Sequence, residues 1–200
     1  MARGLARDHE QKRAAIRKGA ARHFADRGFD RASMAGAARA CGVSKALLYH
    51  YYDSKEALLF DILDAHLSTL VTLLEDRAEP PGEPRVRALF RDILIAYRDA
   101  DAEHKLQLES LDALDSELRD RLIAHQRRLV AAMAEAIRPL VPAETPPDRL
   151  RALTMSAFAL LNWFYLWHRP GRGISREEYA ALAADLFING AAAAASGIRT

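Results

Sequence analysis

The stretch from Ser33 to Lys55 constrains this 200-residue chain most, because it predicts two short helices joined by a tight turn. The apolar residues of the first helix recur at i, i+3, i+4 and i+7, and therefore share one face: Met34, Ala37, Ala38 and Cys41. Gly42 follows directly and can adopt the positive φ that ends a helix. The pattern predicts a helix-turn-helix.

The second helix of this stretch has an apolar side and an unusually aromatic, basic side. Ser44 stands where an N-cap belongs, since its hydroxyl can accept from the free N–H groups of the next turn. Leu48 and Tyr52 lie one turn apart and are predicted to face inward. The remaining positions are predicted to point elsewhere: Lys45, Leu47, Tyr49, His50 and Tyr51. Such a helix has the shape that enters a DNA major groove.

The outward side chains carry hydrogen-bonding groups suited to DNA. Lys45 can reach guanine O6 and N7 or a phosphate, and His50 can donate to base acceptors or a phosphate. The tyrosine hydroxyls of the same helix can donate to phosphates. Ser33 and Lys55 stand at predicted helix N-termini, where backbone N–H groups favour a phosphate oxygen.

Charge is distributed unevenly along the chain. Residues 1–60 contain 12 of the 29 Lys and Arg residues but only 6 of the 27 Asp and Glu residues, leaving 17 basic and 21 acidic residues in the remainder. A basic head on an acidic body is typical of a domain that meets phosphate. Because such a split is also common in proteins that bind no nucleic acid, the charge alone does not decide the matter.

The first 60 residues carry a set of positions with a familiar spacing: Ile16, Ala20, Ala21, Phe24, Gly28, Phe29, Ser33, Met34, Gly42, Val43, Ser44, Leu48, Tyr49 and the run from Ser54 to Leu58. This set resembles the N-terminal signature of the TetR/AcrR-type one-component repressors. Together with the N-cap, the resemblance implies these candidate DNA-binding residues: Ser33, Ser44, Lys45, Ala46, Leu47, Tyr49, His50, Tyr51 and Lys55.

Two residues depart from the family pattern. Leu47 stands where many relatives have Thr; it cannot donate to a phosphate, so we expect contact with a thymine methyl group or no contact. Ala37 stands where a larger Ile or Leu is usual, so we expect looser packing under the first short helix.

The rest of the chain reads as helices separated by breaks. We expect a polar, mobile arm over residues 1–9 and a helix over 10–27, and beyond the helix-turn-helix further helices at 55–78, 86–99, 116–140, 147–168 and from 176 onward, with a less periodic segment at 104–114. No alternating strand pattern occurs, so the predicted fold is all-α with about nine helices. We predict a DNA-binding domain over residues 1–53 and an effector and dimerisation domain over residues 54–200.

Aromatic and apolar residues of the second domain suggest a ligand pocket. Each such residue is individually more typical of a core, but the cluster around the tryptophans resembles the wall of a mostly apolar pocket with a few polar groups. The predicted effector-binding residues are Phe90, Leu94, Tyr97, Gln107, Leu111, Met133, Trp163, Phe164, Trp167 and Arg169.

The predicted helix over 147–168 is apolar nearly all round, so several of its sides must be covered. We expect a second subunit to supply the cover, through the last two helices of each chain. The predicted interface of this homodimer is Leu160, Trp163, Leu182, Leu186 and Phe187.

The C-terminal run from Asn162 to Ala191 resembles TetR-type regulators of catabolic operons that respond to acyl-CoA thioesters. Together with the run from Ser44 to Ile62, it looks closest to the phenylacetate-degradation repressors. The resemblance implies a repressor that an acyl-CoA such as phenylacetyl-CoA releases from a palindromic operator. The basic side chains that could meet the CoA phosphates are Arg91, Arg98, Lys105, Arg127, Arg128, Arg169 and Arg172.

Three alternatives stay open on the sequence alone. The effector could be another apolar or aromatic molecule, such as a drug or an efflux substrate. The protein could be an activator or a repressor without an effector, whose second domain only dimerises. It could also be a sensor bundle or helical enzyme that uses its helix-turn-helix for protein contacts.

Several other classes are disfavoured. The chain has no Gly-rich phosphate loop, GxSxG or HExxH motif, and its seven histidines show no i, i+3 or i, i+4 pairs, so we predict neither an enzyme nor a metal or cofactor site. The single Cys41 allows no intrachain disulfide and is interpreted as a small packed residue. The N-terminus has no apolar signal core, and the apolar run over 152–167 is shorter than the about 20 residues of a spanning helix. We therefore expect a cytoplasmic protein that does not associate with membranes.

Overall fold

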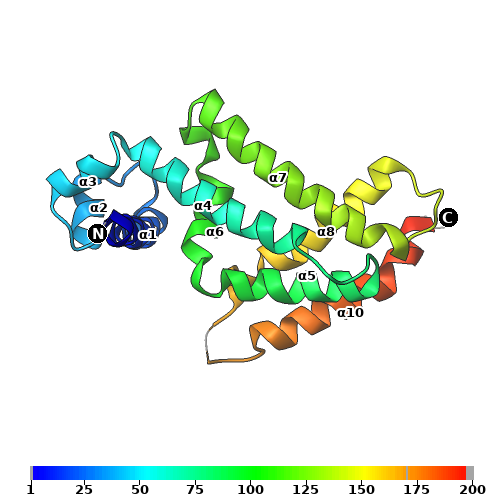
Figure 1. The fold of residues 1–200 in the computed structure, drawn as a ribbon. Coiled ribbons are helices and arrows are strands. Elements are labelled where there is room, and N and C mark those ends of the chain that lie inside the picture. The colour runs from blue at the N-terminus through cyan, green and yellow to red at the C-terminus, as the bar shows by residue number, and fades with distance from the viewer. Residues whose placement is uncertain (1, 170, 197–200) are drawn as a thin grey trace. The chain divides into compact units, whose positions relative to one another are not determined.

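The computed structural model describes residues 2–169 and 171–196, and within that part of the chain it is all-α (Figure 1). The prediction of an all-α fold is therefore confirmed. The helices are α1 (Ala2–Arg27), α2 (Met34–Ala40), α3 (Lys45–Tyr51), α4 (Lys55–Glu75), α5 (Glu83–Ala96), α6 (Asp101–Glu109), α7 (Ser116–Ile137), α8 (Pro147–Asn162), α9 (Phe164–Trp167) and α10 (Arg176–Ser196). Short 3₁₀ turns follow α5, α6 and α7 at Tyr97–Asp99, Leu111–Ala113 and Arg138–Leu140.

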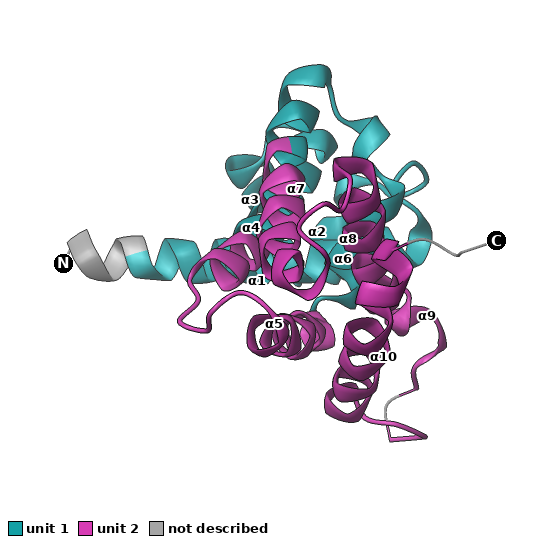
Figure 2. Cartoon of the chain, turned by 90° about the vertical axis from the view of Figure 1, so that its right-hand side faces the viewer, with its two compact units in different colours: residues 1–68, 100–123 teal, residues 69–99, 124–200 magenta. Residues whose placement is uncertain are grey.

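The chain forms two compact units, coloured separately in Figure 2. Unit 1 comprises residues 1–68 and 100–123, and unit 2 comprises residues 69–99 and 124–200. Both α4 and α7 contribute residues to each unit. The predicted boundary at residue 53 separates a DNA-binding from an effector domain, whereas these units are defined by which residues pack together. Unit 1 therefore contains residues 54–68 and 100–123 in addition to the helix-turn-helix.

Unit 1 is built around α1, which packs against α2 and α6. Ile16 and Phe24 of α1 are buried together with Leu48 of α3 and Leu58 of α4, so these three helices share one apolar core. The approach of α1 to the turn after α2 requires a glycine: a Cβ on Gly19 would lie 2.9 Å from the Cys41 sulfur.

The ends of the short helices in unit 1 are held by capping side chains. Ser33 accepts from the Gly36 N–H at 3.1 Å, and Ser44 accepts from the Leu47 N–H at 3.0 Å. Ser54 caps α4 by accepting from the Ala57 N–H at 3.0 Å. Gly42 has a φ of 64°, which confirms its predicted role in the turn.

Unit 2 contains α5 and α10 side by side, with α8 also against α10 (Figures 1 and 2). Phe90 of α5 and Phe187 of α10 are both buried, with ring centroids 5.7 Å apart. At the N-terminus of α10, Ser175 and Glu178 form a reciprocal capping box. This box and the paired phenylalanines fix the position of α10 within unit 2.

Three helices differ from the sequence-based expectation. One is α6, which forms at Asp101–Glu109 where the sequence indicated a less periodic segment over 104–114. α1 begins at Ala2, so the arm expected over residues 1–9 is helical from residue 2. The single helix expected over 147–168 is broken at Trp163, between α8 and α9. The break coincides with a competing donor, since the Tyr179 hydroxyl donates to the Leu160 carbonyl at 2.8 Å. A helix continuing past Trp163 would use that carbonyl as a backbone acceptor.

Two of the described helices, α4 and α10, are long and apolar enough to cross a membrane by length and composition alone. Core helices of proteins without membrane spans pass the same test. In α4, 56% of the most apolar 18-residue window is buried within the protein, so its leucines have a core role that accounts for its composition.

A buried histidine pair lies in unit 1. His66 of α4 is 9% exposed and His104 of α6 is fully buried, with ring centroids 6.4 Å apart. Burial above all, together with the charges of the neighbouring His104 and Lys18, lowers the pKa of His66 to about 3. His66 is therefore a packed neutral residue.

We predict that His66 makes the protein less stable in mild acid. The unfolded chain takes up a proton at His66 below about pH 6.5 and the folded chain does not, so the free energy of unfolding falls as pH drops. At about pH 5.5, one pH unit below that value, His66 lowers the free energy of unfolding by about 1.4 kcal/mol. Urea unfolding at pH 7.5 and 5.5 should show a smaller pH effect in His66→Leu than in wild type, whereas the exposed His50→Ala variant should keep the wild-type effect. Equal pH effects in His66→Leu and wild type would contradict the assignment.

Candidate nucleic-acid interface

Helix α3 is the second helix of the helix-turn-helix, which we call the recognition helix, and it has one buried and one exposed face. Leu48 is fully buried and Tyr52, its C-cap, is 5% exposed, as predicted. Lys45, Tyr49 and His50 are exposed on the other side. Ser44 and Ala46 are also exposed, whereas Leu47 and Tyr51 are half-buried. The structure therefore brings the predicted residues 44–51 together on one short helix.

The exposed side chains of this helix are partly ordered by one another. The Lys45 ammonium lies 5.6 Å from the centroid of the Tyr49 ring, a cation–π geometry that holds both side chains on the same face. Ser33 is exposed at the start of α2, and its oxygen is used as a cap acceptor. Its hydroxyl hydrogen remains able to donate to a phosphate.

Lys55 stands at the N-terminus of α4, as predicted, but its side chain binds the loop before α2. Its ammonium donates to the carbonyl of Phe29 at 2.9 Å and lies over the Phe29 ring at 4.3 Å. It also donates to the carbonyls of Asp30 and Ala32. Because an ammonium has three hydrogens, a phosphate contact by Lys55 would compete with these three bonds. In this structure Lys55 closes the loop between α1 and α2.

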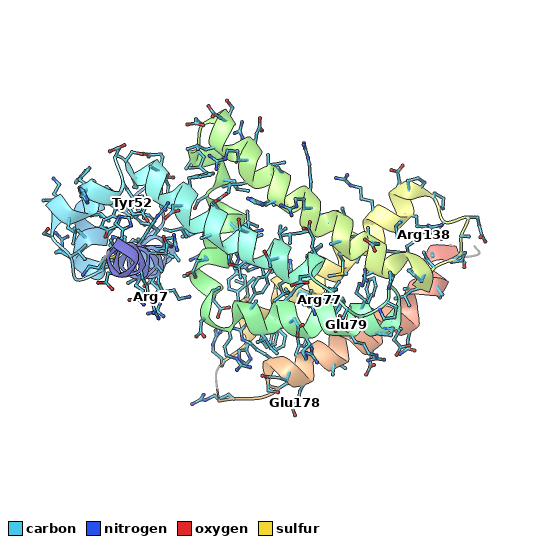
Figure 3. All side chains as sticks on the ribbon, in the orientation of Figure 1. Arg7, Tyr52, Arg77, Glu79, Arg138 and Glu178 are labelled. Carbon is cyan, nitrogen blue, oxygen red and sulfur yellow. The ribbon has the colours of Figure 1, made fainter. Side chains whose placement is uncertain are left out.

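A carboxylate network holds α1, α3 and α4 together behind the exposed face. The Tyr52 hydroxyl, labelled in Figure 3, donates to Asp61 of α4 at 2.6 Å. Arg13 of α1 donates to both oxygens of the same carboxylate at 3.0 and 2.6 Å, and Arg17 donates at 3.3 Å. The C-terminal end of the recognition helix is thus fixed to two neighbouring helices.

The protonation of Tyr52 suits this role. Burial raises the pKa of the Tyr52 phenol well above its ordinary value, and the hydrogen-bonded Asp61 carboxylate raises it further. The hydroxyl therefore keeps its proton and remains a donor throughout the physiological range.

The sequence analysis did not find this network. One signal was available, since Asp61 is a charged residue within the leucine-rich first half of α4. Its partners are separated from it by 9 to 48 positions, so only the packed structure identifies them.

The predicted effector residues are divided between the two units. Gln107 and Leu111 belong to unit 1, and the other eight belong to unit 2. Five of those eight are buried in unit 2: Phe90, Leu94, Tyr97, Met133 and Phe164. Trp163, Trp167 and Arg169 are exposed. The Tyr97 hydroxyl donates to the Asn162 side-chain oxygen at 3.2 Å, so the one polar group among the buried five is satisfied.

Two further features bear on ligand binding. A groove of about 350 Å³ lies between α5 and α10 in unit 2, lined by Glu79, Pro84, Arg87, Ala88, Arg91, Glu177, Ala180, Ala181 and Ala184. None of these is among the ten predicted effector-binding residues, although Arg91 is one of the basic candidates for the CoA phosphates. In unit 1, the Gln107 side-chain oxygen is buried and accepts no hydrogen bond from the described residues, so it is an acceptor that a bound donor could satisfy.

The predicted dimer face is largely exposed in the single chain. Trp163 and Leu186 are each 63% exposed, Leu182 is 46% exposed and Leu160 is half-buried. Phe187 differs, because it packs on Phe90 of its own chain and is only 7% exposed. Met155 of α8, which the sequence analysis did not select, is 49% exposed.

The described residues hold no group of three or more His, Cys, Asp or Glu side chains placed to bind a metal ion. What the site offers is a short capped helix, braced from behind, with lysine, histidine and tyrosine side chains exposed. This arrangement defines a helix-turn-helix DNA-binding protein.

Comparison with known proteins identifies the family. Residues 16–62 match the family described as "Bacterial regulatory proteins, tetR family", and residues 79–191 match "Tetracyclin repressor-like, C-terminal domain". The chain belongs to the TetR family of DNA-binding transcriptional regulators. Members of this family are regulators, which supports a regulatory role over a catalytic one.

Individual relatives extend over most of the chain. The HTH-type transcriptional regulator BetI of Rhizobium meliloti (strain 1021) is 30% identical over 185 residues, covering 89% of this chain and 88% of that protein. A TetR-family regulator from Bordetella parapertussis 12822 has a TM-score of 0.78 at 34% identity, covering 88% and 93% of the two chains. AibR, in a crystal structure with isovaleryl coenzyme A and operator DNA, has a TM-score of 0.74 at 28% identity, covering 88% and 97%.

We predict that Tyr52→Phe weakens the support of the recognition helix. The change removes one hydrogen bond to a charged acceptor, which contributes about 1.5–3 kcal/mol, and leaves Arg13 and Arg17 on Asp61. The free energy of unfolding, measured by urea titration, should fall by that order. Tyr49→Phe is the matched control, since its ring is exposed; an equal loss in both variants would contradict the role given to the network.

Proposed function

We propose that this protein is a homodimeric repressor that binds a palindromic operator and is released from it by an acyl-CoA thioester. The observation that carries the proposal is the exposed, basic and aromatic face of α3. Lys45 and His50 supply donors to base edges and phosphates, and the braced position of the helix lets it enter a major groove as a rigid unit.

The proposed dimer is supported by the apolar surface of α8 and α10. Only 33% of the most apolar window of α10 is buried in the single chain. Leu182 and Leu186 of α10 and Met155 of α8 expose between 46% and 63% of their surface. Large exposed apolar patches mark protein interfaces. A second copy of the chain would cover this face by two-fold symmetry.

Two-fold symmetry also explains why the operator should be palindromic. Two α3 helices related by the dimer axis would read two half-sites whose centres lie one helical turn of DNA apart, about 34–36 Å. The same half-site sequence would then occur in opposite orientation on either side of the axis.

The proposed effector is supported by a relative and by the composition of unit 2. AibR, 28% identical over nearly the whole chain, has been crystallised with isovaleryl coenzyme A. Phe90, Met133 and Phe164 supply buried apolar surface for an acyl group, and an aromatic acyl group such as that of phenylacetyl-CoA matches the aromatic side chains.

The candidates for the CoA phosphates become fewer in the structure. Most of the basic residues considered for this role already pair with a carboxylate or a carbonyl: Arg91 with Asp92, Arg98 with Glu177, Lys105 with the Ala25 carbonyl, Arg128 with Glu75, and Arg169 with the carbonyls of Leu166 and His168. Among the described residues, the side chains of Arg127 and Arg172 are exposed and make no such bond. We therefore favour Arg127 and Arg172 for the phosphates.

Effector and operator would act on one another through the two states of the dimer. If the thioester weakens operator binding, the operator weakens thioester binding by the same factor, because the coupling free energy is reciprocal. As a DNA-binding regulator of this family, the protein would act in the cytoplasm without a membrane partner.

We predict that Leu182→Glu combined with Leu186→Glu converts the dimer to a monomer. Two carboxylates placed in a desolvated apolar interface are destabilising, while in the monomer both positions are exposed. Light scattering after size-exclusion chromatography measures the mass. Leu108→Glu on α6 is the matched control, because Leu108 is 51% exposed and lies outside the proposed interface. A dimer that survives the double change would place the interface elsewhere.

The function is tested by fluorescence anisotropy on a duplex that the wild-type protein selects from a random-sequence pool. At fixed salt, we expect phenylacetyl-CoA, isovaleryl-CoA or a long-chain acyl-CoA to release the DNA and the corresponding free acid to leave it bound. Release by one thioester alone would identify the acyl group. Unchanged DNA binding across the panel would contradict the acyl-CoA assignment and leave the DNA-binding assignment intact.

The DNA-binding face has its own control in the same assay. Lys45→Ala with His50→Ala removes two donors whose contacts are worth roughly 1–3 kcal/mol each, so affinity should fall at least about thirtyfold. Arg149→Ala, an exposed cation in unit 2, should leave affinity unchanged.

A further inference from the structure

The first turns of α1 lack the apolar anchoring that holds the rest of the helix. The first buried residue of α1 after position 6 is Ile16, and residues 7–15 are exposed or half-buried. A helical segment as short as residues 7–15 is marginally stable in water by itself, so it needs contacts with other elements to stay folded. Its contacts are made by side chains that face α3 and α4.

One of these contacts reaches the recognition helix directly. The His9 ring stacks on the Tyr51 ring with centroids 4.7 Å apart and planes inclined by 29°. Tyr51 is also in an edge-on contact with His50, with centroids 5.7 Å apart and planes at 86°. Tyr51 therefore has aromatic neighbours on both α1 and α3.

The contact is part of a regular arrangement along one face of α1. His9 and Arg13 are one turn apart, and they meet consecutive residues at the end of α3. His9 stacks on Tyr51, while Arg13 shares the Asp61 carboxylate with the Tyr52 hydroxyl. Two side chains of α1 therefore hold residues 51 and 52 in place. The exposed His9 contacts Tyr51, and the half-buried Arg13 contacts the carboxylate that binds Tyr52.

We propose that His9 is a positioning residue for Tyr51, holding its ring in one orientation on the DNA-facing side of α3. The inference rests on the proposed function and on the prediction, made from the sequence, that the Tyr51 hydroxyl donates to an operator phosphate. A side chain ordered before binding does not lose its rotamer freedom at the interface, which favours the complex. His9 acts through Tyr51 in this scheme and does not itself read DNA.

The stacking also brings a basic segment to the DNA-binding surface. Arg7, labelled in Figure 3, and Lys12 lie within one turn of His9 and are exposed. A helix fixed to α3 at His9 carries these cations with it. They would add to the phosphate attraction of the face without specifying sequence.

The test is a set of variants on the operator duplex selected by the wild-type protein. His9→Ala should weaken affinity about fivefold or more, because both subunits of the dimer lose an ordered side chain. His9→Phe keeps a ring that can stack but cannot donate a hydrogen bond, and it should bind within about twofold of wild type. Gln11→Ala, also exposed on α1, is the matched control and should not change affinity.

A double-mutant cycle separates positioning from direct contact. If His9 acts through Tyr51, His9→Ala should have no further effect in a Tyr51→Ala background. The thermal midpoint of the free protein should be the same for wild type and His9→Ala, since loss of the stack can free only the first turns of α1 and the buried core begins at Ile16. Additive losses in the cycle, binding by His9→Phe as weak as by His9→Ala, or wild-type affinity of His9→Ala would each overturn the proposal.

The same experiment distinguishes this inference from the proposed function. Weak binding by Lys45→Ala with His50→Ala, together with wild-type binding by His9→Ala, overturns only the role of His9. Full binding by the Lys45 and His50 variant overturns the DNA-reading face, and the role of His9 with it.

Discussion

The Asp61 carboxylate is the interaction on which the DNA-binding half of the molecule depends. It receives hydrogen bonds from Arg13 and Arg17 of α1 and from Tyr52 at the end of α3. A helix of seven residues cannot hold its own orientation, because it is too short to be stable alone and has one buried leucine. The network gives its C-terminal end a fixed place, while the Ser44 cap satisfies its N-terminal end.

The short elements were predictable because their signals are local. The caps at Ser44 and Ser175, the glycine turn at Gly42 and the inward face of α3 each depend on residues within one turn of each other. The break at Trp163 was not predictable, because it coincides with a hydroxyl on Tyr179 in another helix. The same holds for Lys55, whose three carbonyl partners come from the loop before α2.

In the candidate site, too, features set by neighbouring residues were predictable from the sequence, and features set by residues far apart in the chain were not. The exposed residues of α3 followed from a helical period, and the structure places them as expected. For the effector-binding site, the helical spacing of apolar residues correctly identified side chains that are buried. It could not distinguish core residues from ligand-binding residues, because both kinds are buried. Phe187, which was predicted to lie in the dimer interface, is 7% exposed and packs on Phe90 of its own chain, so its helical position alone does not separate a core role from an interface role.

The distribution of tryptophan gives the protein a built-in optical probe. Both tryptophans of the chain, Trp163 and Trp167, lie in unit 2, and both expose half or more of their surface. Trp167 also lies edge-on to Phe164 and Tyr179, in the aromatic cluster beside α9. Emission excited selectively from tryptophan therefore arises from unit 2 alone, and the helix-turn-helix is silent at that wavelength. Events at the aromatic cluster and at the exposed α8 and α10 surface can be followed without a label, while DNA occupies the other unit.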